Sequence, residues 1–291
     1  MFSGTLVALI TPFSDGQVDY ETLTELVEFH LESGTDGIVP VGTTGECPTL
    51  GHEEHKRVIE RVVDTVSGQV PVIAGTGSNS TAEAIELTAF ARKIGADASL
   101  QVAPYYNKPT QDGFCQHFKA IADEVDLPMV LYNIPGRCGG SGLTAETVAR
   151  LAKHENVVAI KEATGSLDMA SEIAMRCDLT VLSGDDSLTL PLASVGGKGV
   201  ISVVANIVPA DVKAMTDLIL EGDLISARKW HRKLFGLAKN MLSLATNPIP
   251  IKAAMAMLNM ASDEMRLPMT ELTESQATVL RKTLKDYGLL T

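Results

Sequence analysis

The sequence contains no apolar run long enough to cross a membrane, because its apolar stretches are strand-length and a spanning helix needs ~20 residues. Basic residues are also missing from its beginning, where the first lysine or arginine is Lys56. The N-terminal region therefore lacks the positive segment of a secretory signal and the arginines of a transit peptide. From these absences we expect a cytoplasmic protein with no membrane partner.

Cysteine and positive charge are both scarce. The four cysteines are widely spaced and form no CxxC pair, which favours reduced thiols over a disulfide framework or a zinc knuckle. The 24 lysines and arginines are outnumbered by 36 acidic residues, and the net charge is -12. Such a chain repels phosphate backbones and has no basic stripe, so we expect no nucleic-acid partner. A small acidic substrate would need a local cation inside a pocket.

Strand-like and helix-like segments alternate along most of the chain. Amphipathic segments, with apolar residues three and four positions apart, separate eight short β-like runs. The alternation predicts an α/β protein that forms a closed (β/α)8 barrel, or TIM barrel, and a doubly wound open sheet is the alternative. The β-like runs cover residues 5–10, 37–41, 70–74, 98–102, 129–133, 157–161, 180–183 and 199–203, and the helical segments include 20–32, 52–66, 81–94 and 144–153.

The pattern changes after the eighth run. From about Trp230 onward the chain reads as helix only, with leucine, alanine and methionine at helical spacing. We interpret this part as a C-terminal helical extension that packs on the barrel or on another subunit. The predicted division is a catalytic (β/α)8 barrel over residues 1–225 and a helical region over residues 226–291.

Lys161 ends the sixth β-like run, and a loop-like segment follows it at once. The catalytic groups of an α/β barrel come from the carboxyl ends of its strands, where a lysine in apolar surroundings can lose its proton and attack a carbonyl. An ordinary lysine has a pKa of ~10.4, and this pKa must fall by ~3 before the amine is substantially neutral at pH 7. Lys161 is therefore a candidate nucleophile, and a strand-end lysine that reaches into solvent is the alternative.

Thr43 and Thr44 lie in a glycine-flanked loop after the second run. Glycines let backbone amides and threonine hydroxyls converge on a small anion, so this loop is suited to holding a carboxylate. A plain turn is the alternative. Because the loop follows a strand, it would share the rim that carries Lys161.

Tyrosines and an arginine follow the fourth and fifth runs. Tyr105 and Tyr106 come after the fourth run, and Tyr132 lies in the fifth. A tyrosine near an amine can shuttle protons while a carbinolamine forms and dehydrates, although tyrosine is also a common filler of half-buried surface. Arg137 stands among glycines after the fifth run, where a guanidinium could fork a substrate carboxylate, and a solvated surface charge is the alternative.

Other motifs are discounted. The run Gly75-Thr76-Gly77 starts like a dinucleotide fingerprint, but Ser80 stands where the third glycine is required. His52 and His55 do not have the HExxH zinc spacing, so we expect no metal site. Asp185-Asp186 is interpreted as helix capping and not as an acid-base pair.

Five motifs, VGTTGE, PYYN, LYNIPGR, AIKEATG and SGDD, occur in this order over most of the predicted barrel. Together they closely resemble the dihydrodipicolinate synthase (4-hydroxy-tetrahydrodipicolinate synthase) family of pyruvate-dependent class I aldolases, from end to end of the chain. The resemblance implies a (β/α)8 barrel, usually a homotetramer built as a dimer of dimers. It also implies a lyase in which a lysine forms a Schiff base with pyruvate, and the enamine attacks L-aspartate 4-semialdehyde in lysine (diaminopimelate) biosynthesis. No cofactor or metal is implied, because the protonated imine itself withdraws electrons.

The resemblance also implies residue roles. Lys161 matches the Schiff-base lysine, and Tyr132 matches the tyrosine that relays protons. Thr43 matches the hydroxyl that links this tyrosine to a second one, which matches Tyr106 and in the family reaches in from the neighbouring subunit. The implied substrate-binding groups are Thr43 and Thr44 for the pyruvate carboxylate, Arg137 for the aldehyde substrate, and the carbonyls of Gly184 and Ile201.

A feedback site for L-lysine is often found at the tight-dimer interface of this family. Cys47-Pro48 replaces the Ser-Ala pair common beside that site, and proline fixes φ and removes an amide donor. The residues that match the allosteric motif are His52, His55, Asn79, Glu83 and Tyr105.

Two alternatives to this function stay open from the sequence. N-acetylneuraminate lyase and keto-deoxy-sugar aldolases resemble this family in barrel and lysine, but they generally lack the arginine aligned with Arg137. A non-catalytic sensor barrel that binds an amino or keto acid belongs to a different class. Pure binding would not require an amine beside two phenols, which favours the enzyme.

Overall fold

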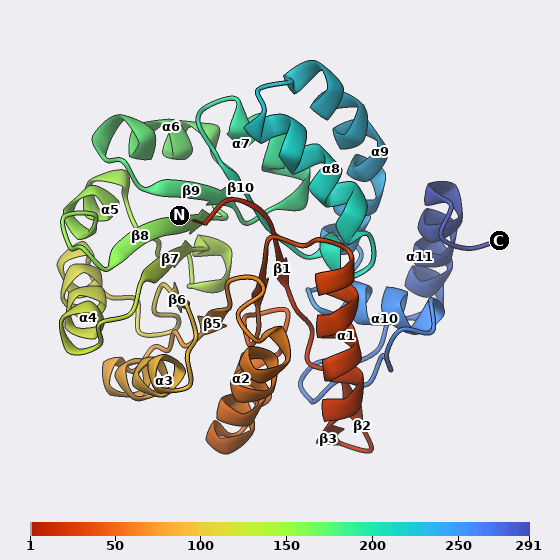
Figure 1. Ribbon diagram of the computed structural model, residues 1–291, viewed down its shortest axis with the longest axis horizontal. Helices are drawn as coiled ribbons and strands as arrows, with labels where there is room; N and C mark the ends of the chain where they lie inside the picture. The colour runs from red at the N-terminus through yellow and green to blue at the C-terminus, as the bar shows by residue number, and fades with distance from the viewer. Residues whose placement is uncertain (1) are drawn as a thin grey trace.

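Eight parallel strands form a barrel surrounded by helices in the computed structural model, which describes residues 2–291 (Figure 1). Their hydrogen-bonded order is β4, β1, β10, β9, β8, β7, β6, β5, and a parallel bridge between Ile38 and Val72 joins the two ends. The predicted (β/α)8 barrel is thus confirmed. The strands are β1 (Gly4–Ala8), β4 (Gly37–Val39), β5 (Ile73–Gly75), β6 (Ala98–Val102), β7 (Met129–Asn133), β8 (Val157–Glu162), β9 (Thr180–Ser183) and β10 (Gly199–Ser202).

The barrel helices begin where polar side chains cap them. Asp19 accepts hydrogen bonds from the backbone N–H groups of Glu21 and Thr22, and Ser80 and Thr110 cap later helices in the same manner. The helices are α1 (Tyr20–Glu32), α2 (His52–Val66), α3 (Thr81–Lys93), α4 (Gln111–Glu124), α5 (Ala145–Leu151), α6 (Leu167–Arg176), α7 (Thr189–Ala193) and α8 (Pro209–Leu220).

The apolar core has an inner and an outer part. Side chains alternate along each strand, so one set fills the barrel and the other packs under the helices. The inner set includes Leu6, Val130, Ala159, Leu182 and Ile201, all at most 4% exposed. This packed interior forms the floor beneath the carboxyl ends of the strands.

A short hairpin after β1 was not predicted. Its strands β2 (Phe13–Ser14) and β3 (Gln17–Val18) pair antiparallel around Asp15 and Gly16, which both have positive φ. This two-residue Asp-Gly turn is a strong local hairpin signal. Phe13 is fully buried and anchors the hairpin on the rest of the molecule.

The C-terminal region contains α9 (Leu224–Ser243), α10 (Ile249–Met257) and α11 (Glu274–Tyr287), which lie on one side of the barrel (Figure 1). The expectation of helix only was wrong, because residues 258–273 are not helical. Asn259, at φ +57°, stops α10, and Pro268 lacks the N–H that a continuing helix needs. The division at 225/226 stays a prediction.

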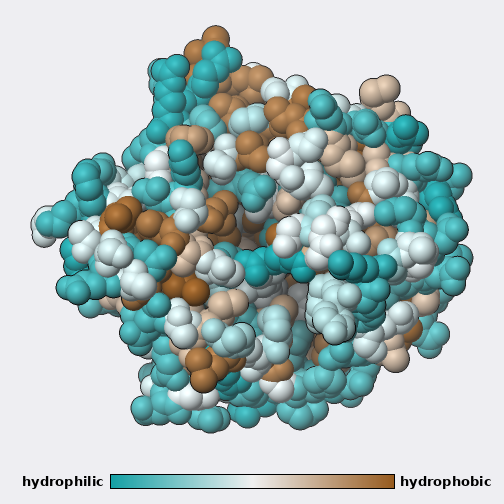
Figure 2. Space-filling view, turned by 180° about the vertical axis from the view of Figure 1, so that it is seen from behind, coloured by the Kyte–Doolittle hydropathy of each residue, from teal (hydrophilic) through white to brown (hydrophobic). Residues whose placement is uncertain are grey.

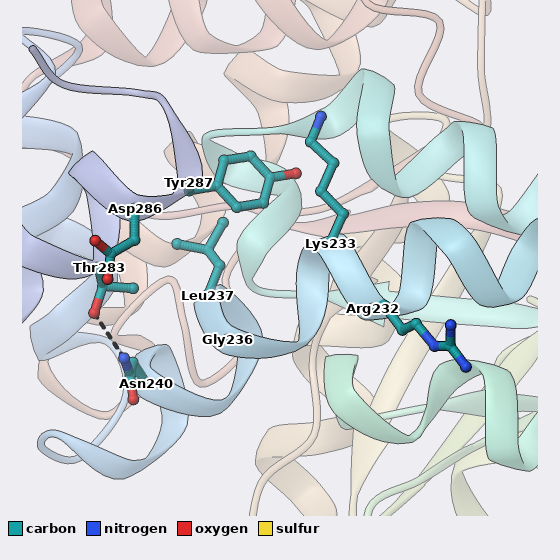
Figure 3. A pocket seen from close by; sticks show the side chains of 8 residues that line it. All are labelled: Arg232, Lys233, Gly236, Leu237, Asn240, Thr283, Asp286 and Tyr287. Carbon is teal, nitrogen blue, oxygen red and sulfur yellow. Dashed lines mark hydrogen bonds between the residues drawn. The ribbon is translucent and has the colours of Figure 1, made fainter.

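A surface groove separates α9 from α11 (Figure 3). Across it Asn240 Nδ2 donates to Thr283 Oγ1 at 2.6 Å, and Lys233 Nζ lies 5.1 Å from the centre of the Tyr287 ring. Figure 2 shows hydrophilic residues around most of the edge of the opposite face, with apolar patches between them. Within residues 2–291, no helix is both long enough and apolar enough to span a membrane.

Candidate active site

Lys161 lies near the carboxyl end of β8 and is only 5% exposed. In the sheet register it stands between Tyr132 of β7 and Leu182 of β9. Tyr132 and Leu182 both belong to the packed barrel interior, and side chains in register on neighbouring strands share a face. The lysine side chain therefore lies between two side chains of the barrel interior at the rim of the barrel.

The amine of Lys161 has a strongly perturbed environment. Its Nζ lies 4.3 Å from the centre of the Tyr132 ring. Burial, the main cause, lowers the pKa of Lys161 from 10.5 to about 8; Asp185 and Asp186 act in the opposite direction, and Arg137 reinforces the burial effect. A neutral amine is a nucleophile, so the site is built to supply one near physiological pH.

The Tyr132 phenol is 5% exposed, and burial raises its pKa above the usual value of 10. The positive charge of Arg137 and hydrogen bonding with the Thr43 side chain partly offset this rise. Tyr132 and Thr43 also line one small cavity, together with residues of the loops after β4 and β5. A phenol that keeps its proton beside an amine can donate and recover that proton during imine chemistry.

Thr43 and Thr44 lie in a tight turn after β4, which we call the threonine turn (residues 42–46). Gly45 N donates to Gly42 O, and Glu46 N donates to Thr43 O, both at 3.1 Å. Within residues 2–291 the N–H groups of Thr43 and Thr44 donate no hydrogen bond. The turn thus presents two hydroxyls and two free amides, which is the arrangement that a carboxylate requires.

Gly184 brings the loop after β9 against Lys161. A Cβ on Gly184 would lie 3.2 Å from Lys161 Cε and 2.6 Å from the Ala163 Cβ, so only glycine permits this approach. Ile201 lies one strand further, in β10, with its side chain in the barrel interior.

The two aspartates after Gly184 have different surroundings. Asp186 accepts hydrogen bonds from the Ser202 hydroxyl and from the N–H groups of Val203 and Val204. It therefore caps the turn after β10 and not the helix that follows it in sequence, where the capping role was expected. Asp185 makes no capping bond, and Lys161 lowers the pKa that burial has raised.

Arg137 ends the short 3-10 helix η2 (Pro135–Arg137) and is exposed at the rim. Its Nη2 donates to Asn247 O at 3.0 Å, and Asn247 Nδ2 donates to Thr44 Oγ1 at 3.0 Å. Asn247 thus connects the arginine to the threonine turn. The sequence reasoning missed Asn247, because it read this region as helix; the Asn-Pro pair at 247–248 is the signal of a break.

Tyr106 lies on the surface of the chain. It is 91% exposed and has φ +69°, a conformation that is unfavourable for an aromatic residue. The structure therefore does not bury it beside Lys161 of the same chain.

A second polar cluster lies around the start of α2 and the loops after β5 and β6. His52 Nε2 lies 2.7 Å from Glu83 Oε1, and Ser78 Oγ donates to the other oxygen of Glu83 at 2.5 Å. His55 Nε2 lies 2.7 Å from Gly75 O, while burial lowers its pKa. Asn79 Nδ2 donates to Tyr105 O at 3.2 Å. These five predicted residues, with Ser78, thus fall in one region of the structure.

No group of three or more histidine, cysteine, aspartate or glutamate side chains suited to hold a metal ion occurs in residues 2–291. The four cysteines are free thiols.

The fold and this rim define a class of protein, a (β/α)8-barrel enzyme of the lyase type with a buried lysine at the carboxyl ends of its strands. The model of the dihydrodipicolinate synthetase family matches residues 1–287, and the chain belongs to that family. This confirms the resemblance seen in the five motifs.

Known proteins similar to this chain agree. A 4-hydroxy-tetrahydrodipicolinate synthase of Geotalea uraniireducens is 55% identical over 292 residues, covering 100% of both chains. A crystal structure of chloride-inhibited dihydrodipicolinate synthase from Acinetobacter baumannii, complexed with pyruvate, is 44% identical with a TM-score of 0.97 and 100% coverage of both chains. The enzyme from Cyanidioschyzon merolae with lysine bound is 42% identical, with a TM-score of 0.95 and 99% coverage of both. The function of the chain is 4-hydroxy-tetrahydrodipicolinate synthesis in lysine biosynthesis, and the sugar-acid aldolase alternative is not favoured.

Proposed function

We propose that the enzyme condenses pyruvate with L-aspartate 4-semialdehyde through a Schiff base on Lys161. The observation that carries this proposal is the buried Lys161 amine, 4.3 Å from the Tyr132 ring and with a pKa lowered to about 8. A similar enzyme has been solved in complex with pyruvate, which supports the keto acid as the first substrate.

The first step forms the imine. The neutral Lys161 amine attacks the keto carbon of pyruvate, and the Tyr132 hydroxyl delivers a proton to the carbonyl oxygen. The carbinolamine then loses water to give the protonated imine. Tyr132 recovers its proton through Thr43 and the Tyr106 of a neighbouring subunit, so that Lys161, Tyr132, Thr43 and Tyr106 form the catalytic set.

The second step forms the carbon-carbon bond. The positive imine nitrogen withdraws electrons, so the pyruvate methyl group loses a proton and becomes an enamine. The enamine carbon attacks the aldehyde carbon of the second substrate, whose oxygen takes up the proton that the methyl group released. The amino group of the same substrate then attacks the imine carbon, so that the ring closes and Lys161 leaves as the free amine. No metal or cofactor enters this scheme, since the imine itself serves as the electron sink.

Binding groups surround this chemistry. The free amides and hydroxyls of Thr43 and Thr44 hold the pyruvate carboxylate, and the carbonyls of Gly184 and Ile201 line the pocket. Arg137 meets the carboxylate of the aldehyde substrate. An exposed guanidinium held by a backbone carbonyl is free to form such a pair, and a bidentate arginine-carboxylate pair is strong and directional.

We further propose that L-lysine regulates the enzyme at the cluster of His52, His55, Asn79, Glu83 and Tyr105. The His52–Glu83 pair supplies a partner for either charge of an amino acid, and a similar enzyme has been solved with lysine bound. The pair Cys47-Pro48 stands close to this cluster and differs from the family's usual residues. The same site would lie at the interface of a tight dimer within a dimer of dimers, in a reducing cytoplasmic setting that suits the free thiols.

One assay tests these proposals. Borohydride added together with pyruvate should reduce the imine and attach the carbon skeleton of pyruvate to the peptide that contains Lys161, as read by mass spectrometry. Lys161→Arg is the matched control and should remain unmodified. An unlabelled wild-type peptide would exclude the Schiff base, and repeating turnover with added L-lysine tests the regulatory cluster.

A further inference from the structure

Glu46 ends the threonine turn and is buried against a lysine from a distant part of the chain. Its Oε1 lies 2.6 Å from Lys252 Nζ, with the two side chains 2% and 0% exposed. Lys252 belongs to α10, 206 residues further along the sequence. Glu46 itself follows Thr44 by two positions, so any movement of this ion pair is transmitted to the turn.

The ammonium of Lys252 is fully coordinated by the protein. Besides Glu46, it donates to Thr11 O at 3.0 Å and to Glu264 O at 2.6 Å, which accounts for its three N–H groups. The Nζ also lies 4.3 Å from the centre of the Phe13 ring. The lysine therefore joins three separate segments: the loop after β1, the threonine turn and the non-helical stretch after α10.

These contacts of Lys252 form a clamp on the threonine turn, and a second cation, Arg266, extends it. Arg266 donates its backbone N–H to Glu46 Oε2 at 3.3 Å, and its guanidinium holds both oxygens of Glu54 at 2.7 Å. It also donates to Thr49 O and Gly16 O. Arg266 thus holds Glu46 at the end of the turn and also Thr49 and Glu54, which follow it in the sequence.

A clamp of this kind contributes little net stability. Removing two charges from water costs nearly as much as their attraction returns, and apolar replacements of buried ion pairs are often neutral or stabilising. The turn, however, needs external restraint, because Val41 and Glu46 both have positive φ although neither is glycine. The ion pair restrains the strained turn that presents Thr43 and Thr44.

We propose that Lys252 is a positioning residue for the keto-acid carboxylate, acting through Glu46 on Thr43 and Thr44. This inference rests on the proposed carboxylate-binding role of the two threonines. The region after the barrel then has an indirect part in substrate binding, and it contributes no group to the bond-forming steps.

The test is the double variant Glu46→Gln/Lys252→Met in the full-length enzyme, which removes both buried charges and preserves volume. We expect KM for pyruvate to rise between about tenfold and 100-fold, because losing hydrogen bonds to a charged carboxylate weakens binding on that scale, while kcat falls less. Hydrogen-deuterium exchange should become faster at the amides of residues 45–47 without a matching rise in the barrel core.

Lys213→Met is the matched control. Its amine pairs with Asp36 at 2.9 Å just before β4, at the opposite end of the barrel. It should lower thermal stability without changing KM for pyruvate. A folded double variant with parental KM and parental exchange overturns the inference and leaves the Schiff base intact, provided that the parent is labelled at Lys161. A parent that is not labelled overturns both proposals.

If the double variant does not fold, the same two measurements on Arg266→Gln test the inference. The Arg266 side chain is 20% exposed, so its loss is easier to tolerate. We expect a smaller rise in KM for pyruvate and faster exchange at residues 45–47. An unchanged KM with unchanged exchange in this variant overturns the inference equally.

Discussion

Two buried lysines in this molecule have opposite environments. Burial is the main cause that lowers the pKa of both Lys161 and Lys252. Lys252 has a carboxylate and two carbonyls as hydrogen-bond acceptors, which hold its charge in place. Lys161 faces the ring of Tyr132, and no hydrogen bond contributes to its pKa. Lys161 is therefore suited to losing its proton, and Lys252 is suited to keeping a fixed positive charge.

The pH dependence of imine formation follows from the pKa of Lys161. With a pKa of about 8, roughly a tenth of the amine is neutral at pH 7, against about one in 2,500 for an ordinary lysine. Lowering the pH protonates the amine, so trapping of pyruvate by cyanoborohydride should slow about tenfold per pH unit below 8 and level off above it.

Asp185→Asn tests the assignment of this pH dependence. The negative charge of Asp185 raises the pKa of Lys161, so its removal should move the midpoint of the trapping profile to lower pH. Asp178→Asn changes an exposed carboxylate at the other end of β9 and should leave the midpoint in place. A profile without any break between about pH 6 and 10 would contradict the assignment to Lys161.

At the scale of elements, the site depends on loops that approach each other closely. The strands β7 and β8 carry Tyr132 and Lys161 themselves, and the loops after β4, β7 and β9 supply the other groups. Parallel strands bring all of these groups to one end of the barrel. One such close approach is that of Gly184 to Lys161.

Gly184→Ala should damage the site more than the fold. The new methyl group would lie 2.6 Å from the Ala163 Cβ and 3.1 Å from Glu162 O, which forces the loop or β8 to shift. Overpacking of this kind costs about 1–3 kcal/mol in unfolding free energy, and trapping of pyruvate should slow in the folded fraction.

Gly236→Ala is the control for this substitution. Gly236 lies in α9, and a methyl group added there would meet no atom of a neighbouring element within 4 Å, so alanine should be neutral or stabilising by up to ~1 kcal/mol. Chemical denaturation and the trapping rate measure both variants. Equal trapping rates in Gly184→Ala and Gly236→Ala would show that the close approach at Gly184 is unimportant for the amine.

At the scale of the whole molecule, the helices after the barrel share its core. Buried side chains of α9, α10 and α11, such as Leu237, Met255 and Leu284, belong to the same apolar cluster as those of α1, α2 and α8. The clamp at Lys252 adds a polar connection. We therefore propose the regions 1–225 and 226–291 as parts that fold and unfold together.

Mixing two inactive variants tests whether Tyr106 acts across a subunit interface. Tyr106→Phe and Lys161→Arg should each lower turnover strongly. A hybrid dimer of the two chains has one site with an intact lysine and an intact partner tyrosine, so co-expression with two affinity tags should restore activity in the purified hybrid. An inactive hybrid would place Tyr106 within its own chain's site, and a fully active Tyr106→Phe variant would place it outside the catalytic set.

Much of the fold was predictable because its signals are local. The helices α1 and α2 match the predicted segments 20–32 and 52–66, and the runs 98–102, 129–133 and 180–183 are strands with those bounds. Each has a regular apolar period or a capping residue next to it. The stretch after α10 was not predicted, because its conformation depends on contacts of Arg266 with Glu46, Glu54 and Phe13, which are far away in sequence.

The sequence by itself determined the barrel, the family and the lysine at the end of its strand, since alternation, motif order and strand ends are properties of neighbouring residues. Only the tertiary structure decided how strongly the Lys161 amine is shielded from water and that Asp186 caps the turn after β10. It also decided that Asn247 and Lys252 contact the threonine turn. The reason is physical: desolvation and buried hydrogen bonds arise between segments that the chain brings together only on folding.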